Sequence, residues 1–135
     1  MNENVSFRVK GIQTDVDGNQ NIEKEENQGR YYNKNGTHYI MADGARYRFN
    51  HRSLEVVKNG DLNAKLIFEN GQCRVCDYAT PYGNFPLEFR TKQISLSESE
   101  REIEISVEYE IFNQDEFVSK NHTIISVFSL TGLFS

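Results

Sequence analysis

Several features of common protein classes are missing from this chain. No apolar run approaches the roughly 20 residues that a membrane-spanning helix needs, so we expect no membrane contact. The first ten residues alternate polar and apolar side chains and lack the apolar core of a signal peptide. We therefore expect a cytoplasmic protein in which the two cysteines stay reduced.

The chain also lacks an excess of positive charge, with 15 Lys and Arg residues against 20 Asp and Glu residues. The net charge is −5, which argues against broad nucleic-acid binding because such binding needs many Lys and Arg residues. Residues 46–52 do interleave basic and aromatic side chains, as single-strand nucleic-acid platforms do. In a strand, however, Tyr47 and Phe49 face one side while Arg46 and Arg48 face the other. We favour an amphipathic strand and do not expect nucleic acid as a partner.

The chain is rich in hairpin signals. Asp-Gly and Asn-Gly pairs suit tight hairpin turns, because these residues tolerate positive φ angles. Between the pairs, polar and apolar residues alternate as in strands with one buried face, most clearly from Glu102 to Phe112. No segment keeps an apolar period of about 3.6 residues, so little helix is expected. The pairs are Asp17-Gly18, Asn35-Gly36, Asp43-Gly44, Asn59-Gly60 and Asn70-Gly71.

These patterns predict one all-β domain over residues 1–135, an antiparallel up-and-down β-barrel of about eight to ten strands. The strand from Glu102 to Phe112 would span roughly 35 Å, and strands of that length favour a barrel over a sandwich. The parity of the apolar residues changes between Phe89 and Ile94, which predicts a β-bulge near Thr91 to Gln93.

Four stretches of the sequence share a pattern with a known family. They are Gly29 to Gly36 with Tyr39-Ile40, Lys65 to Gly71, Tyr78-Ala79-Thr80-Pro81-Tyr82-Gly83, and Val107 to Ile111 continuing through Asn121 to Val127. In these stretches the chain resembles the YwiB-like family of bacterial proteins, whereas Cys73, Cys76 and the apolar tail from Leu130 depart from the family pattern. The resemblance implies a calycin-like β-barrel, the superfamily that includes lipocalins and fatty-acid-binding proteins, and a bacterial source. It implies no activity, since the family has no established function.

Two patterns imitate metal or redox sites. Asp15, Asp17, Asn19 and Glu26 are spaced like the ligands of a calcium loop, but Gln20 occupies the position where the sharp turn needs Gly. We interpret this segment as a solvated turn. Cys73 and Cys76 lie three apart in an expected strand, so they should face opposite sides and act as structural residues. We expect no metal and no cofactor.

The three histidines show no ligand-like or catalytic spacing. His38, His51 and His122 accompany no nucleophile motif, although a Ser-His-Asp arrangement assembled in space would leave no trace in the sequence. We therefore expect no catalysis.

The aromatic residues carry the functional hypothesis. Seven Tyr and nine Phe residues, with no Trp, either fill the barrel or line a pocket, and the short chain favours filling. The preferred function is nevertheless a binding barrel for a small, largely apolar ligand. Apolar contacts and a hydroxyl donor at the pocket mouth would come from Tyr78, Tyr82, Phe85 and Phe89, with Tyr39 as an added wall.

The alternative is a filled-core interaction protein that acts as a homodimer. Its contact would be a strand edge or the apolar tail Leu130 to Ser135, which otherwise caps a barrel end. An enclosed void of roughly 300 Å³ or more would distinguish the binding barrel from this alternative.

Overall fold

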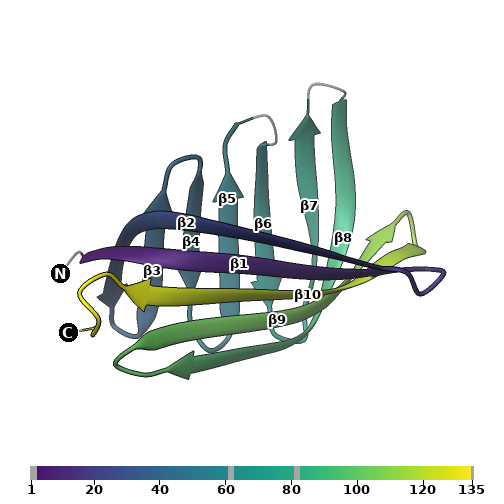
Figure 1. Ribbon diagram of the computed structural model, residues 1–135. Helices are drawn as coiled ribbons and strands as arrows, with labels where there is room; N and C mark the ends of the chain where they lie inside the picture. The colour runs from purple at the N-terminus through teal and green to yellow at the C-terminus, as the bar shows by residue number, and fades with distance from the viewer. Residues whose placement is uncertain (1–2, 61–62, 81–82, 135) are drawn as a thin grey trace.

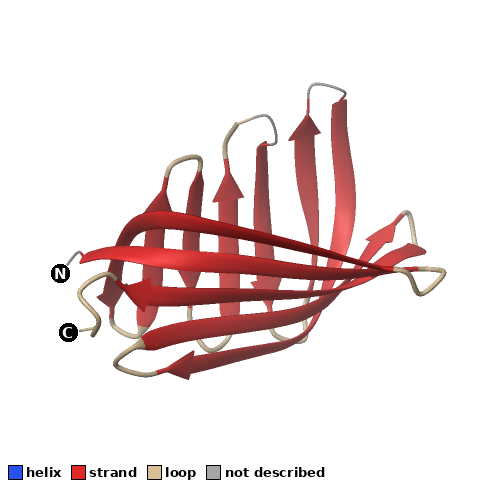
Figure 2. Cartoon of the chain, in the orientation of Figure 1, coloured by secondary structure: helices blue, strands red, loops and turns tan. Residues whose placement is uncertain are grey.

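The computed structural model describes residues 3–60, 63–80 and 83–134 and shows an all-β protein. Within these residues there are ten strands and no helix (Figure 2). No helix of the described part is therefore long and apolar enough to cross a membrane. The strands are β1 (Glu3–Asp15), β2 (Gln20–Lys34), β3 (Thr37–Ala42), β4 (Ala45–Phe49), β5 (Ser53–Lys58), β6 (Asn63–Glu69), β7 (Cys73–Thr80), β8 (Gly83–Glu98), β9 (Glu102–Asn113) and β10 (Glu116–Ser129).

The strands form a closed up-and-down barrel. Each strand neighbours the next one in the chain, and β10 returns to β1, with which it pairs from Val5↔Ser129 to Asp15↔Ser119. The long strands β1, β2, β9 and β10 cross the shorter strands β3–β7 (Figure 1). The predicted antiparallel barrel and its approximate strand number are confirmed.

The predicted β-bulge in β8 is also confirmed. The register between β8 and β9 shifts between Thr91 and Gln93, and this shift places both Phe89 and Ile94 in the core. A bulge bends its strand and increases the local twist. In Figure 1, β8 accordingly starts beside β7 and curves round to run along β9.

Two hairpins use turns in which both central residues have positive φ. Asn35 and Gly36, at 54° and 84°, join β2 to β3, as the Asn-Gly pair predicts. Gln114 and Asp115, at 50° and 67°, join β9 to β10 without any glycine. Gln and Asp are weaker sequence signals for this turn than Asn-Gly, so Gln114-Asp115 is not among the turn pairs found in the sequence.

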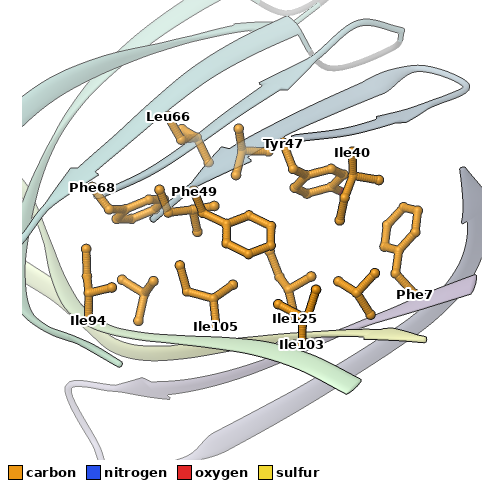
Figure 3. Close-up of a cluster of buried hydrophobic side chains, with 14 of the residues drawn as sticks. Phe7, Ile40, Tyr47, Phe49, Leu66, Phe68, Ile94, Ile103, Ile105 and Ile125 are labelled. Atoms are coloured by element: carbon orange, nitrogen blue, oxygen red, sulfur yellow. The ribbon is translucent and has the colours of Figure 1, made fainter. Parts of the chain in front are cut away.

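The core fills the end of the barrel near the chain termini. Phe7, Phe49, Ile40 and Ile105 are essentially inaccessible to solvent. Figure 3 shows side chains of the short strands, such as Phe49 and Leu66, facing those of the long strands, such as Ile105. This end matches the filled core that the aromatic content predicts.

The C-terminal tail closes the same end. The backbone N–H of Phe134 donates to the carbonyl of Glu100 at 2.6 Å. The Phe134 ring packs edge-on against Tyr31, with 5.2 Å between ring centroids. The tail thus caps a barrel end, although Leu130 and Leu133 stay half exposed.

Candidate functional site

The opposite half of the barrel contains a cavity of about 630 Å³. It lies between the turn end of the β1–β2 hairpin, strands β9 and β10, and the short strands β4–β6. The residues that line it are Val9, Gly11, Ile12, Gln13, Asn21, Glu23, Lys24, Glu25, Tyr47, Leu54, Val56, Lys58, Leu66, Phe68, Tyr109, Ile111, Asn121, Thr123 and Ile125.

The cavity arises because the inward side chains of β1 become small as the strand leaves the core. Phe7 is followed on the same face by Val9 and then by Gly11. A Cβ atom added to Gly11 would meet no atom within 4 Å, so this position borders open space. Gly11 needs no special backbone angle there, and its effect is to leave room.

One wall of the cavity is apolar. Leu54 and Val56 of β5 and Leu66 and Phe68 of β6 face inward and are directly paired across the two strands. On the other side, Tyr109 and Ile111 of β9 continue the apolar face. These surfaces follow from the period-two alternation of half-buried strands.

The other wall is polar. On β2, Glu25 pairs with Val9 and Glu23 pairs with Gly11, which places both carboxylates on the inner face. Asn121 and Thr123 extend the polar wall onto β10. Toward this half, β1, β2 and β10 therefore change their inner faces from apolar to polar.

The cavity opens beside a strand edge. Among the described residues, β2 pairs with β3 only from Arg30 to Lys34, whereas it pairs with β1 along Gln20 to Tyr31. Residues 20–28 are all exposed. The ring of strands is thus closed at one end and split along β2 at the other.

Tyr47 presents its hydroxyl to this space. Its side chain is only 4% exposed, and the hydroxyl makes no hydrogen bond within the described part of the chain. Burial raises the pKa of Tyr47 to about 12, and the negative charge of Glu25 adds to the shift. Figure 3 draws Tyr47 among the side chains that converge inside the barrel.

Asn121 and Tyr109 have fixed orientations on the long strands. The Asn121 amide donates to Ser119 Oγ at 2.9 Å, which leaves its carbonyl oxygen as a free acceptor among the described residues. The Tyr109 hydroxyl lies 3.3 Å from Thr123 Oγ1. Burial raises the pKa of Tyr109, and this hydrogen bond opposes the shift.

Two lysines also border the cavity. Lys58 lies on the inner face of β5, because it shares its parity with Val56, and it ends that strand. Lys24 pairs with Lys10 on the outer face and contributes only to the rim. Neither lysine forms an ion pair with Glu23 or Glu25 in the part of the chain that the structure describes.

The structure does not bring the sequence-predicted mouth residues together at this cavity. Tyr39 lies outside the barrel, where it stacks on Tyr32 with 4.6 Å between ring centroids. Phe89 is buried in the core against Phe68, and Phe85 is half exposed. The side chain of Tyr78 and the whole of Tyr82 lie outside the described residues.

From the sequence alone, the alternation of β1 is followed only as far as its apolar residues, and the cavity is therefore not predicted. The parity of Val5, Phe7 and Val9, continued along β1, reaches Gly11 and Gln13. This continuation was the available signal for a hollow, polar-walled half.

The metal-like and redox-like patterns behave as structural features. The Asp15 carboxylate accepts the backbone N–H groups of Asp17 and Asn19, both at 2.9 Å, and so stabilises the β1–β2 turn. Cys73 is exposed and Cys76 is buried, which confirms that they face opposite sides. Burial raises the pKa of the Cys76 thiol. No group of three or more metal-ligating side chains occurs among the described residues.

Two histidines have defined partners. His38 is 2% exposed, and its Nε2 lies 2.6 Å from Glu98 Oε1 while its Nδ1 lies 2.7 Å from the Tyr31 hydroxyl. His122 contacts Ser106 Oγ at 2.5 Å on the outer face of the barrel. Neither pair borders the cavity.

The comparisons with known proteins agree with this fold. A family model described as a domain of unknown function (DUF1934) matches residues 7–125. The crystal structure of the ywiB protein from Bacillus subtilis aligns with a TM-score of 0.80 at 20% sequence identity, covering 95% of this chain and 92% of that chain. No curated protein matches. Because the family model spans most of the chain, this protein belongs to the YwiB-like family that carries this domain of unknown function.

Proposed function

We propose that this protein binds a small amphipathic molecule in the cavity and performs no chemistry on it. The observation that carries the proposal is the cavity itself. It is a cleft that opens along β2, and its volume of about 630 Å³ lies in the range of roughly 300–1,000 Å³ that is typical of small-molecule sites.

The two walls support a ligand with both apolar and polar parts. Leu54, Val56 and Leu66 offer apolar contact, while the opposite wall offers oriented polar groups. This arrangement is typical of ligand sites, in which a few polar groups fix the orientation of a mostly apolar ligand. The sequence suggested a largely apolar ligand, and the polar wall adds a polar part to that hypothesis.

We propose binding without catalysis because the described lining residues combine no nucleophile with a positioned base. A bacterial source and a cytoplasmic location belong to the same proposal. The bacterial source is supported by the likeness to the Bacillus subtilis protein.

Native mass spectrometry of the protein, purified gently from its own host, tests the proposal. We expect a co-purifying small molecule that is released on denaturation. Gly11→Leu should abolish its retention, because the new side chain enters the open space beside Gly11. Gly11→Ala is the matched control and should retain the molecule, since one methyl group fills little of the cavity. An empty wild-type protein, or retention by Gly11→Leu, would contradict the proposal.

A homodimer is the second candidate. The observation that favours it is the exposed apolar side chain of Val75 on the outer face of the β7–β8 hairpin, which is 68% exposed; Phe85, 49% exposed, lies on the opposite face of the same hairpin. This hairpin extends past the ends of the other short strands (Figure 1). Analytical ultracentrifugation would detect a dimer, and Val75→Lys should dissociate a dimer built on this hairpin.

A further inference from the structure

We propose that the ligand carries a protonated amine, which Glu23 and Glu25 hold beside the Tyr47 hydroxyl while its apolar body packs on the β5–β6 wall. This assignment rests on the proposed ligand-binding function and names the chemical class of the ligand. It follows from the polar groups that the cavity leaves without partners.

The two carboxylates lie where a ligand would enter. Both are on the inner face of β2, at the split between β2 and the short strands. Neither forms an ion pair within the described residues, and the one side-chain hydrogen bond to them comes from Asn21, which reaches Glu23 Oε1 at 3.5 Å. They are available as charged acceptors.

Tyr47 supplies an independent observation. The side chain is almost completely buried and lines the cavity, and its hydroxyl has no hydrogen-bond partner in the described part of the chain. The hydroxyl oxygen itself stays accessible from the cavity, since Thr91 Oγ1 is the one fully buried side-chain atom without a partner among the described residues. The Tyr47 hydroxyl is thus open to a ligand. Glu25 lines the same cavity, and its negative charge adds to the raised pKa of Tyr47. A ligand group placed between them would satisfy both.

The remaining polar groups of the cavity also favour a ligand group that donates hydrogen bonds. The carbonyl oxygen of Asn121 accepts hydrogen bonds, because its amide nitrogen already donates to Ser119. An ammonium group has three donors and no acceptor, and it therefore matches a wall of acceptors. Among the described residues that line the cavity, Lys58 is the one cation on the inner face, and it lies on β5, across the cavity from β2. The two carboxylates outnumber it.

Three probes with the same apolar body separate the possibilities. These are 1-naphthylmethylamine, 1-naphthalenemethanol and 1-naphthoate, whose polar groups are cationic, neutral and anionic at neutral pH. Isothermal titration calorimetry with the wild-type protein should show the tightest binding for the amine. Added salt should weaken the amine alone, because the carboxylates are exposed and screened.

Matched variants assign the charge effect to the inner face. Glu25→Gln should weaken amine binding about five- to tenfold, as expected for a charge-assisted hydrogen bond at a partly solvated site, and should leave the alcohol within about twofold. Glu26→Gln makes the same change one residue along, where the side chain pairs with Arg8 on the outer face at 3.3 Å. It should change nothing. Lys58→Gln should strengthen amine binding.

The outcomes distinguish the two proposals. If the alcohol binds but the amine has no advantage, or if naphthoate binds tightest, the amine assignment is wrong and the binding function stands. An amine preference that survives Glu25→Gln and Glu23→Gln together also overturns the assignment. If no probe binds the wild-type protein, the binding function itself is contradicted.

Discussion

Two inward-facing glycines, Gly11 and Gly29, lie on neighbouring strands under opposite constraints. A Cβ atom on Gly29 would lie 2.8 Å from the backbone oxygen of Met41, whereas one on Gly11 would meet nothing. The absence of a side chain at Gly29 therefore lets β2 pack closely against the backbone of β3 at Met41. Gly11 borders the cavity.

We expect Gly29→Ala to lower the free energy of unfolding by about 1–3 kcal/mol, because backbone atoms must shift to admit the methyl group. Gly11→Ala should be neutral or stabilise by about 0.5–1 kcal/mol, because alanine reduces the entropy of the unfolded chain. Urea denaturation of both variants measures the difference. Equal effects at the two positions would contradict the distinction between packed and hollow halves.

Tyr47 makes stability depend on alkaline pH. Its hydroxyl has a pKa of about 12 in the folded protein and about 10 in the unfolded chain. Between these values the unfolded chain releases the proton first, so stability falls as the pH rises from 10 to 12. In Tyr47→Phe, the decrease in unfolding free energy over this pH range should be smaller than in the wild type by on the order of 2 kcal/mol.

The check is denaturant unfolding at about pH 9 and pH 12 for the wild type and Tyr47→Phe. Tyr31 and Tyr109, whose pKa values burial also raises, are present in both proteins and cancel in the difference. Identical pH profiles would show that Tyr47 is not buried as described.

At the scale of elements, His38 joins strands that are not neighbours in the sheet. It links Tyr31 of β2 and its own strand β3 to Glu98 at the end of β8. In the tautomer with the proton on Nε2, this N–H donates a hydrogen bond to Glu98 Oε1, and Nδ1 accepts one from the Tyr31 hydroxyl. The imidazole also stacks on Phe49, with 5.0 Å between ring centroids. This link joins β2 and β3 to β8 at the closed end of the barrel.

His38→Phe keeps the stacking but leaves the buried Tyr31 hydroxyl without this partner, so we expect a loss of about 1–3 kcal/mol in unfolding free energy. Glu98→Gln keeps an oxygen acceptor on a half-exposed side chain and should cost less than about 1 kcal/mol. Thermal unfolding of both variants tests this order. A larger loss for Glu98→Gln would mean that the ionic contact dominates the link.

At the scale of the whole molecule, the barrel has one capped end and one open end. The cap depends on the Phe134 ring against Tyr31 and on the backbone hydrogen bond to Glu100. We expect Phe134→Ala to lower stability by about 1–2 kcal/mol, because an aromatic contact is lost from a partly exposed site. Leu133→Ala is the control, since Leu133 is half exposed, and it should cost less. Equal losses would contradict a specific cap.

The strand pattern was predictable because it is local. Alternation along Glu102 to Phe112 and the Asn35-Gly36 turn each depend on neighbouring residues, and both were correct. The bulge near Thr91 was visible as a change of parity within one strand. The opposite placement of Cys73 and Cys76 followed from the same period of two.

The site was not predictable in this way because its walls come from distant parts of the chain. Glu25, Tyr47 and Asn121 meet only when the barrel closes. The predicted mouth residues Phe85 and Phe89 lie near one turn in the sequence, but Phe89 is further along β8, where its ring is buried in the core against Phe68.

The sequence by itself determined the all-β barrel, its strand order and most of its register, since each follows from alternation and turn chemistry between adjacent segments. Only the tertiary structure decided which half of the barrel is filled and which is hollow. That outcome depends on the volumes of inward side chains from several strands together, Phe7 and Phe49 at one end and Gly11 at the other, and volume is a property of the packed molecule.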